Sequence, residues 1–155
     1  MLGPLQGLSV LDLFAGTGAL GIEALSRGAE RAVFVDCERR ALSFLARNID
    51  ALRLPEGEAE VRCEDALLAV RRAVRRGETF DLIFVDPPYA LAQRLAPSLA
   101  QCLPLLLRQG GRVVLQSDAR EGLQLPLAPF VQRRYRDTSI TICTADERAG
   151  TKDQS

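Results

Sequence analysis

An apolar segment, a glycine-rich turn and a helical segment follow one another near the start of the chain. Residues 9–14 (SVLDLF) have the apolar character of a buried strand, and residues 19–27 have helical spacing. Between them, Gly16, Gly18 and Gly21 match the pattern G-x-G-x-x-G. A strand that passes through such a turn into a helix is typical of βαβ units, so this region predicts an α/β fold with a parallel sheet.

The same alternation of strand and helix continues along the chain. Further strands are expected at 32–35, 60–63, 80–85 and 112–116, and helices at 38–52, 66–76 and 91–107. Pro97 and Pro104 are expected to divide the last of these helices into two pieces. The pair Gly110-Gly111 is expected to turn the chain into the fifth strand.

The end of the chain has a different pattern. Residues 130–135 and 139–144 alternate in the manner of strands and are separated by three residues, which predicts an antiparallel hairpin. The expected fold is therefore α/β: a Rossmann-like, seven-stranded, mostly parallel, doubly wound sheet with an antiparallel C-terminal hairpin. Residues 1–145 are expected to form one domain, and the polar residues 146–155 a disordered tail.

Composition narrows the classes of function. No apolar run approaches the ~20 residues of a membrane helix, and the N-terminus has no secretory signal, so the cytoplasm is the expected location. A net charge of zero argues against a protein that coats nucleic acid. The four cysteines lie far apart in sequence, which predicts small buried residues rather than disulfides or a metal site.

The chain contains no histidine. This excludes Ser-His-Asp and Cys-His catalysis, as well as metal sites that require imidazole. Any chemistry must therefore depend on carboxylates, backbone groups, positioning, or a cofactor that brings its own reactivity.

A rigid polar segment follows the fourth predicted strand, where Asp86-Pro87-Pro88-Tyr89 ends the apolar run 80–85. The prolines stop the strand and stiffen the backbone. Ligands of open α/β sheets bind at the carboxyl ends of the strands, which is where this segment is expected. A carboxylate, a fixed carbonyl and an aromatic ring together favour binding of a planar base through its exocyclic amine.

Three further acids are expected at the same edge of the sheet. Asp12 lies four residues before the first glycine of the turn, Asp36 ends the second strand, and Asp65 follows the third. A carboxylate at Asp36 can accept hydrogen bonds from ribose hydroxyls. Asp65 has two interpretations, an acceptor for an adenine amino group or the N-cap of the next helix.

The glycine pattern alone suits nicotinamide and flavin enzymes equally well. Two observations favour another ligand. A carboxylate at Asp12 disfavours a pyrophosphate but can bind a cationic amino group. A dinucleotide also leaves the segment Asp86-Pro87-Pro88-Tyr89 without a role.

Together these residues resemble the class I S-adenosylmethionine-dependent methyltransferases. The segment from Asp86 to Tyr89 is similar to the motif of members that methylate exocyclic amines of nucleobases. The phrases VLDLFAGTGALGIEALSRGA (10–29), FVDCERRAL (34–42) and FDLIFVDPPY (80–89) resemble in particular the RsmD family of 16S ribosomal RNA guanine-N2 methyltransferases. The resemblance extends from about residue 8 to about residue 144.

The resemblance implies S-adenosylmethionine as the cofactor, and 16S ribosomal RNA or a small-subunit assembly particle as the partner. A monomer is expected. The resemblance also implies a cofactor site formed by Asp12, Phe14, Gly16, Gly18, Asp36 and Asp65. It implies catalytic roles for Asp86, Pro87 and Tyr89, and contact of the base with Pro88 and Tyr89. Members of that family usually begin with a basic N-terminal segment, which is expected to be absent here because the first strand begins about nine residues into the chain.

Three other functions remain open at this point. One is an enzyme that acts on another amine, adenine N6 in DNA or RNA or a protein glutamine amide, since the segment from Asp86 to Tyr89 is shared with adenine methyltransferases. An NAD-dependent oxidoreductase would use the glycine turn, and a non-catalytic S-adenosylmethionine-binding module would retain the fold without turnover.

Overall fold

The computed structural model describes residues 3–116, 130–135 and 140–145. The predicted tail, 146–155, lies outside them. The elements in chain order are β1 (Ser9–Leu13), α1 (Ala19–Ser26), β2 (Arg31–Asp36), α2 (Arg39–Leu52), β3 (Ala59–Cys63), α3 (Ala66–Arg75), β4 (Phe80–Val85), α4 (Tyr89–Leu106), β5 (Leu107–Gln116), β6 (Phe130–Tyr135) and β7 (Ile140–Ala145).

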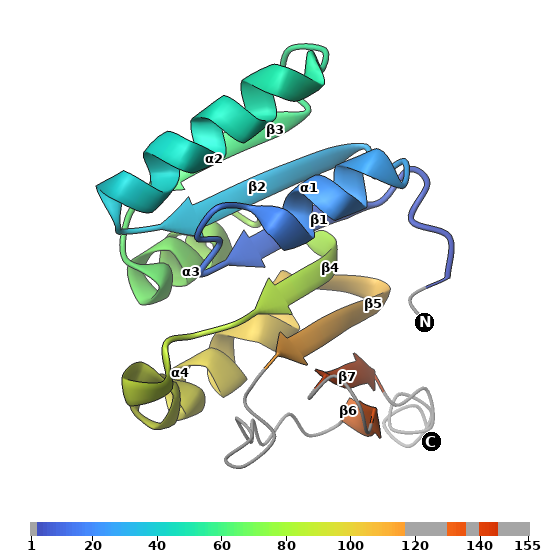
Figure 1. Ribbon diagram of the computed structural model, residues 1–155. Coiled ribbons are helices and arrows are strands. Elements are labelled where there is room, and N and C mark those ends of the chain that lie inside the picture. Colours follow the sequence, from blue (N-terminus) through green and yellow to red (C-terminus); the bar gives the residue numbers. More distant parts are fainter. Residues whose placement is uncertain (1–2, 117–129, 136–139, 146–155) are drawn as a thin grey trace.

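The described strands form one seven-stranded sheet in the order β3-β2-β1-β4-β5-β7-β6. Strands β1 to β5 pair in parallel, whereas β7 pairs antiparallel with both β5 and β6. This arrangement confirms the predicted doubly wound α/β sheet with an antiparallel C-terminal hairpin. Figure 1 shows that the arrowheads of β1, β2 and β4 point to the same side, at the left of the view.

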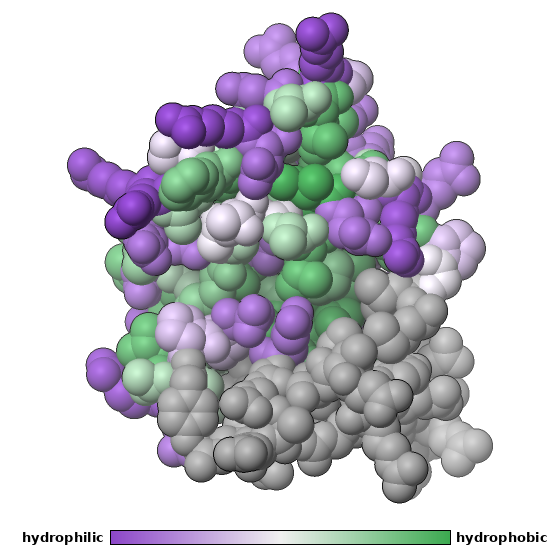
Figure 2. Space-filling model, in the orientation of Figure 1, coloured by the Kyte–Doolittle hydropathy of each residue, from purple (hydrophilic) through white to green (hydrophobic). Residues whose placement is uncertain are grey.

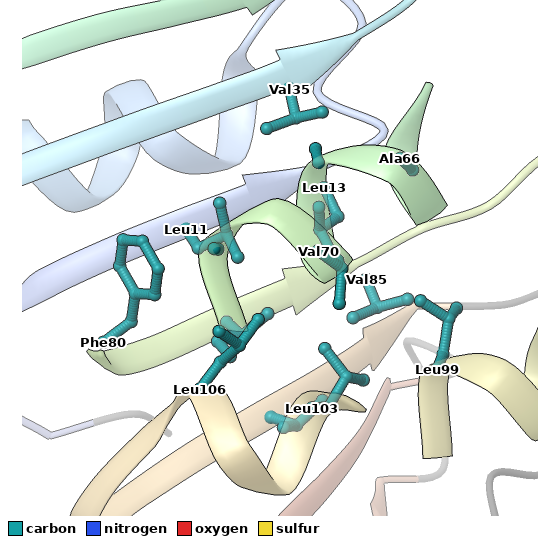
Figure 3. Packing of buried hydrophobic residues seen from close by; sticks show 14 of the residues in the cluster. Leu11, Leu13, Val35, Ala66, Val70, Phe80, Val85, Leu99, Leu103 and Leu106 are labelled. Atoms are coloured by element: carbon teal, nitrogen blue, oxygen red, sulfur yellow. The ribbon is translucent and has the colours of Figure 1, made fainter. Parts of the chain in front are cut away.

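Alternating side chains of the strands build a core on each face of the sheet. Leu11, Leu13, Val35 and Val85 pack against α3 and α4, as Figure 3 shows. Residues of the opposite parity pack against α1 and α2; they include Val10, Ala32, Phe34, Leu82 and Phe84. Because both faces are covered, the central strands are predominantly apolar.

Helix α4 differs from its prediction, because it is one helix from Tyr89 to Leu106 with Pro97 and Pro104 inside it. The predicted division of this helix at the prolines was wrong, because burial of its apolar side chains outweighs the cost of the prolines. Leu99, Leu103 and Leu106 are fully buried along one side of α4. Burying each of these side chains contributes about 1.5–3 kcal/mol, against about 3 kcal/mol for each proline.

Strand β5 also begins earlier than predicted, at Leu107 rather than at residue 112. The glycine pair lies inside it as an irregularity. Leu107 pairs with Phe80 and Arg112 with Leu82, so the register shifts between these two pairs. Gly110 accommodates the shift at φ 79°, in the left-handed region that glycine tolerates best.

Two of the four cysteines depart from the expectation of burial. Cys143 is buried and Cys102 is partly buried, but Cys37 and Cys63 are exposed, and all four are free. Cys63 ends β3 and Cys37 follows β2, at the sheet edge where α2 and α3 begin. None of the described helices combines the length and apolar character that crossing a lipid bilayer requires.

Candidate cofactor and amine site

The predicted site residues come from strand ends that the sheet brings to one edge. Asp12 lies in β1, Asp36 ends β2, and Asp86 directly follows β4. Strand β1 is hydrogen-bonded between β2 and β4, and the three run in parallel. The fold thus brings together three carboxylates that are separated by up to 74 positions in the sequence.

The glycine turn after β1 begins with an unusual backbone conformation. Phe14, Gly16 and Gly18 have φ angles of 61°, 58° and 85°, all in the left-handed region. A methyl group on Gly16 would meet no atom within 4 Å, so the turn is open on that side. One on Gly18 would collide with Leu45, and one on Gly21 with Phe34, so these two glycines serve the packing of α1.

Asp12 is 1% exposed and points toward α1, where its Oδ2 accepts a hydrogen bond of 3.0 Å from the N–H of Gly21. Burial raises the pKa of this carboxyl from 3.8 to about 7, although the bond from Gly21 opposes the increase. The negative charges of Asp86 and Asp36 raise the pKa further. A cluster of carboxylates of this kind favours a positively charged ligand.

Asp36 connects the glycine turn to the start of α2. Its Oδ2 accepts from the N–H of Gly16 at 2.8 Å, and its Oδ1 accepts from the N–H of Glu38 at 2.9 Å. A carboxylate has about four acceptor positions, so both oxygens can still accept from ribose hydroxyls. Asp36 therefore has a structural role that sequence reasoning did not predict, and its contact with ribose stays a prediction.

Asp65 is the N-cap of α3, as one of its two interpretations predicted. Its carboxylate accepts from the N–H of Leu68 at 3.2 Å. The side chain is exposed, so it also remains accessible to a ligand at the end of β3. The contact with adenine stays a prediction.

The segment after β4 presents a carboxylate and a backbone carbonyl. Asp86 is exposed to solvent on one side, and desolvation on the other raises the pKa of its carboxyl. The carbonyl of Pro88 accepts from the N–H groups of Leu91 and Ala92, in the first turn of α4. Within the described part of the chain, the carbonyl of Pro87 accepts no hydrogen bond, so it is available to a ligand.

The structure describes the side chain of only one of the two aromatic residues of the predicted site. Tyr89 begins α4, but its side chain lies outside the described part of the structure, so its stacking on a base stays a prediction. Phe14 follows β1, and its side chain packs against the core beneath α3 and α4. Its contact with the cofactor also stays a prediction.

One contact at the turn has no clear signal in the sequence. The side chain of Asn48, exposed on α2, donates a hydrogen bond of 3.1 Å to the carbonyl of Thr17. At the opposite end of the sheet, Asp81 accepts from the N–H of Ser9 at 2.9 Å and pairs with Arg108. These polar residues have no distinctive spacing, so only the fold identifies their partners.

Comparison with known proteins places this geometry in a family. Residues 2–146 match the family described as "Conserved hypothetical protein 95". The chain belongs to this family. It is the RsmD family of the class I S-adenosylmethionine-dependent methyltransferases, as the sequence resemblance predicted.

Relatives of the chain are named as methyltransferases of ribosomal RNA, some of the small subunit and some of the large subunit. The Bacillus subtilis protein named "Putative rRNA methyltransferase YlbH" is 37% identical over 143 residues, which are 91% of this chain and 77% of that protein. "Ribosomal RNA small subunit methyltransferase D" of Haemophilus influenzae is 35% identical over 79 residues, which are 51% of this chain and 40% of that protein. The solved structure "Putative methyltransferase yhhF from Escherichia coli" has a TM-score of 0.74 at 27% identity, covering 90% of this chain and 76% of that one.

The cofactor of this RsmD-family chain is S-adenosylmethionine. The residues present fit it, because the three carboxylates suit its cationic sulfonium and ammonium groups. The open side of Gly16 also leaves space for a ligand close to the backbone.

Proposed function

We propose that this chain catalyses transfer of a methyl group from S-adenosylmethionine to the exocyclic N2 amine of a guanine in 16S ribosomal RNA. The observation that carries the proposal is the pair of acceptors after β4. The Asp86 carboxylate and the Pro87 carbonyl, which accepts no hydrogen bond from the described residues, are adjacent in the chain and lie beside the carboxylate cluster of β1 and β2. The names of the two relatives above support ribosomal RNA as the substrate.

The two acceptors suit an amine rather than a hydroxyl. A primary amine on an aromatic ring has two N–H donors and a lone pair that is delocalised into the ring. When Asp86 and the Pro87 carbonyl each accept one N–H, the nitrogen is held in place and the lone pair is directed at the methyl group. Orientation and electrostatic stabilisation then supply most of the rate enhancement.

The cofactor, when bound, supplies an electrophilic methyl group on its sulfonium, so the protein does not have to generate one. The residues of β1 and β2 hold the cofactor's cationic and ribose parts. After transfer the methylated amine carries an extra proton, which passes to Asp86 or to solvent. The raised pKa of Asp86 favours its acceptance of that proton.

The base must leave its stack to reach these groups, and Tyr89 provides the aromatic surface on which an extruded base would stack. The segment has no group that distinguishes guanine from adenine by itself. The experiment that tests the function is therefore mass analysis of nucleosides after incubation with S-adenosylmethionine. Small ribosomal subunits, large subunits and purified 16S RNA serve as separate substrates.

The proposal predicts N2-methylguanosine in the small-subunit or 16S RNA samples and none in a matched reaction without cofactor. N6-methyladenosine would overturn the assignment of the base, and a product confined to the large subunit would overturn that of the RNA. Methylated glutamine in ribosomal protein would overturn both. Binding of S-adenosylhomocysteine without a product in any sample would favour a non-catalytic module.

A further inference from the structure

Side chains supply part of the hydrogen bonding at the glycine turn. The first N–H groups of an α-helix have no partner within the helix, and in α1 the N–H of Gly21 is one of them. It donates to the carboxylate of Asp12, at 3.0 Å. The carbonyl of Thr17 precedes the N-cap Gly18, so it lies outside the hydrogen bonds of the helix. The side chain of Asn48 binds this carbonyl, with Nδ2 donating at 3.1 Å.

Helix α2 contacts the turn at two neighbouring points. Asn48 bonds to Thr17, and Leu45, one turn earlier in α2, lies directly against Gly18. Helix α2 also begins just after Asp36, the carboxylate that bonds to the N–H of Gly16. One helix therefore supports the turn from behind and is continuous with the predicted ribose site. Figure 1 shows α2 running alongside β2 and β3.

The turn needs such support because its conformation is costly. Phe14 is a non-glycine residue at φ 61°, a region that L-residues avoid and that costs of the order of 1–3 kcal/mol when it is imposed. In the described part of the chain, three side chains hydrogen-bond to backbone groups of residues 14–21: those of Asp12, Asp36 and Asn48. The first two are carboxylates of the cofactor site, whereas Asn48 is neutral and lies outside it.

We infer that Asn48 is a positioning residue for cofactor binding. It fixes the Thr17 carbonyl and so holds the glycine turn in the conformation that receives S-adenosylmethionine, without touching the cofactor itself. Its place on the exposed side of α2 fits this role. Hydrophilic residues are prominent over α2 in Figure 2.

The test is Asn48→Ala, with the dissociation constant of S-adenosylhomocysteine measured by calorimetry. Loss of one hydrogen bond that orders the turn predicts binding weaker by about three- to tenfold. Alanine has a higher helix propensity than asparagine, so the stability of the unliganded protein is expected to stay equal or to increase. A purely structural role predicts the opposite pair of results: lower stability and unchanged affinity.

Two further variants make the result specific. Asn48→Asp keeps the size of the side chain but replaces the N–H donor by a carboxylate, so it is also expected to weaken binding. Ser43→Ala, on the same helix, changes an exposed side chain that makes no hydrogen bond within the described part of the chain, and it should bind like wild type. Hydrogen exchange of residues 14–21 should be faster in Asn48→Ala than in Ser43→Ala.

The inference is overturned if Asn48→Ala and Asn48→Asp both bind S-adenosylhomocysteine within twofold of wild type. It is also overturned if Asn48→Asp alone retains wild-type affinity, because size rather than donation would then matter. These measurements use the cofactor product only. They therefore stay independent of whether guanine N2 is the methyl acceptor.

Discussion

Asp12 combines two demands that oppose one another in the protein without ligand. Burial and its two carboxylate neighbours raise the pKa of Asp12 to about 7, yet the same cluster of carboxylates would favour a cationic ligand. Carboxylates in functional sites are often held in such environments, at some cost to the stability of the free protein. This residue therefore gives the most direct test of the electrostatics of the site.

The folded protein holds the Asp12 proton more tightly than the unfolded chain does, because the folded pKa of about 7 lies above the ordinary value of 3.8. The contribution of this group to stability is complete below about pH 4 and is lost as the pH rises through 7. We expect Asp12→Asn to remove this decline and to increase the unfolding free energy at pH 8 by roughly 1–4 kcal/mol. Urea denaturation between pH 5 and pH 8, without cofactor, measures it.

Binding of the cofactor is expected to favour the ionised form of Asp12, whereas folding alone favours the protonated form. Binding of a cation favours the ionised form of Asp12, so the affinity of wild type for S-adenosylhomocysteine should rise between pH 6 and pH 8. Asp12→Asn should bind more weakly and with little dependence on pH in that range. A wild-type affinity that is constant from pH 6 to pH 8 would contradict the proposed contact.

Asp86 is expected to separate catalysis from binding. Asp86→Ala removes the carboxylate that accepts from the amine but leaves the glycine turn and Asp36 intact. We expect the turnover number to fall by at least about a hundredfold, the scale of one lost transition-state contact. The dissociation constant of S-adenosylhomocysteine should change by less than about fivefold. Near wild-type turnover in this variant would show that the assignment is wrong.

The exposed thiols report on occupancy of the site. Cys63 is paired with Asp36 across the neighbouring strands, and Cys37 directly follows Asp36 in the chain. A ligand over Asp36 should therefore slow their alkylation by iodoacetamide, in which the sulfur displaces iodide. Mass spectrometry of labelled peptides measures the rates with and without S-adenosylhomocysteine. The partly buried Cys102 is the internal control, and equal rates at Cys37 and Cys63 with and without ligand would contradict this placement.

Helix α4 shows that packing between elements decides features that the local sequence does not reveal. The position of every strand and helix was predicted approximately, because alternating and helical apolar patterns reflect the core directly. The continuity of α4 was not predicted, because it depends on how much apolar surface the completed sheet offers to Leu99 and Leu103. The start of β5 was missed for a similar reason: its glycines occupy an irregular pairing, which is a property of two strands rather than one.

The cost of Pro97 can be measured, since its side chain is exposed in the middle of α4. Pro97→Ala restores an N–H that can donate to the carbonyl of Gln93 and removes a steric conflict. This would increase the unfolding free energy by up to about 3 kcal/mol, but the greater freedom of alanine in the unfolded chain reduces the increase. We expect a net increase in unfolding free energy of roughly 1–2 kcal/mol, from urea denaturation.

Gln101→Ala provides the comparison, because it is an exposed position of the same helix that already has a backbone N–H. Its effect should stay within about 0.5 kcal/mol. A decrease in stability for Pro97→Ala would mean that the helix has adapted to the proline in a way that alanine cannot reproduce.

At the scale of the whole molecule, the order of the strands in the sheet brings residues that are distant in sequence together into one candidate site. The sequence predicted which residues end strands, and the order β2-β1-β4 then brings Asp36, Asp12 and Asp86 to one edge. The sequence could not predict how these residues engage the backbone. Asp36 and Asn48 each bond to a turn residue at least 20 positions away, and such contacts exist only in the folded chain.

The complete arrangement predicts which cofactor stabilises the molecule. S-adenosylhomocysteine at 100 times its dissociation constant should add about 2.7 kcal/mol to the unfolding free energy. In a domain of this size, that corresponds to an increase in melting temperature of roughly 5–10 °C. NAD at the same concentration should produce no shift, because its pyrophosphate would face the carboxylates of Asp12 and Asp86. A melting experiment with both ligands separates the two classes, and an equal shift with NAD would contradict the electrostatic basis of the site.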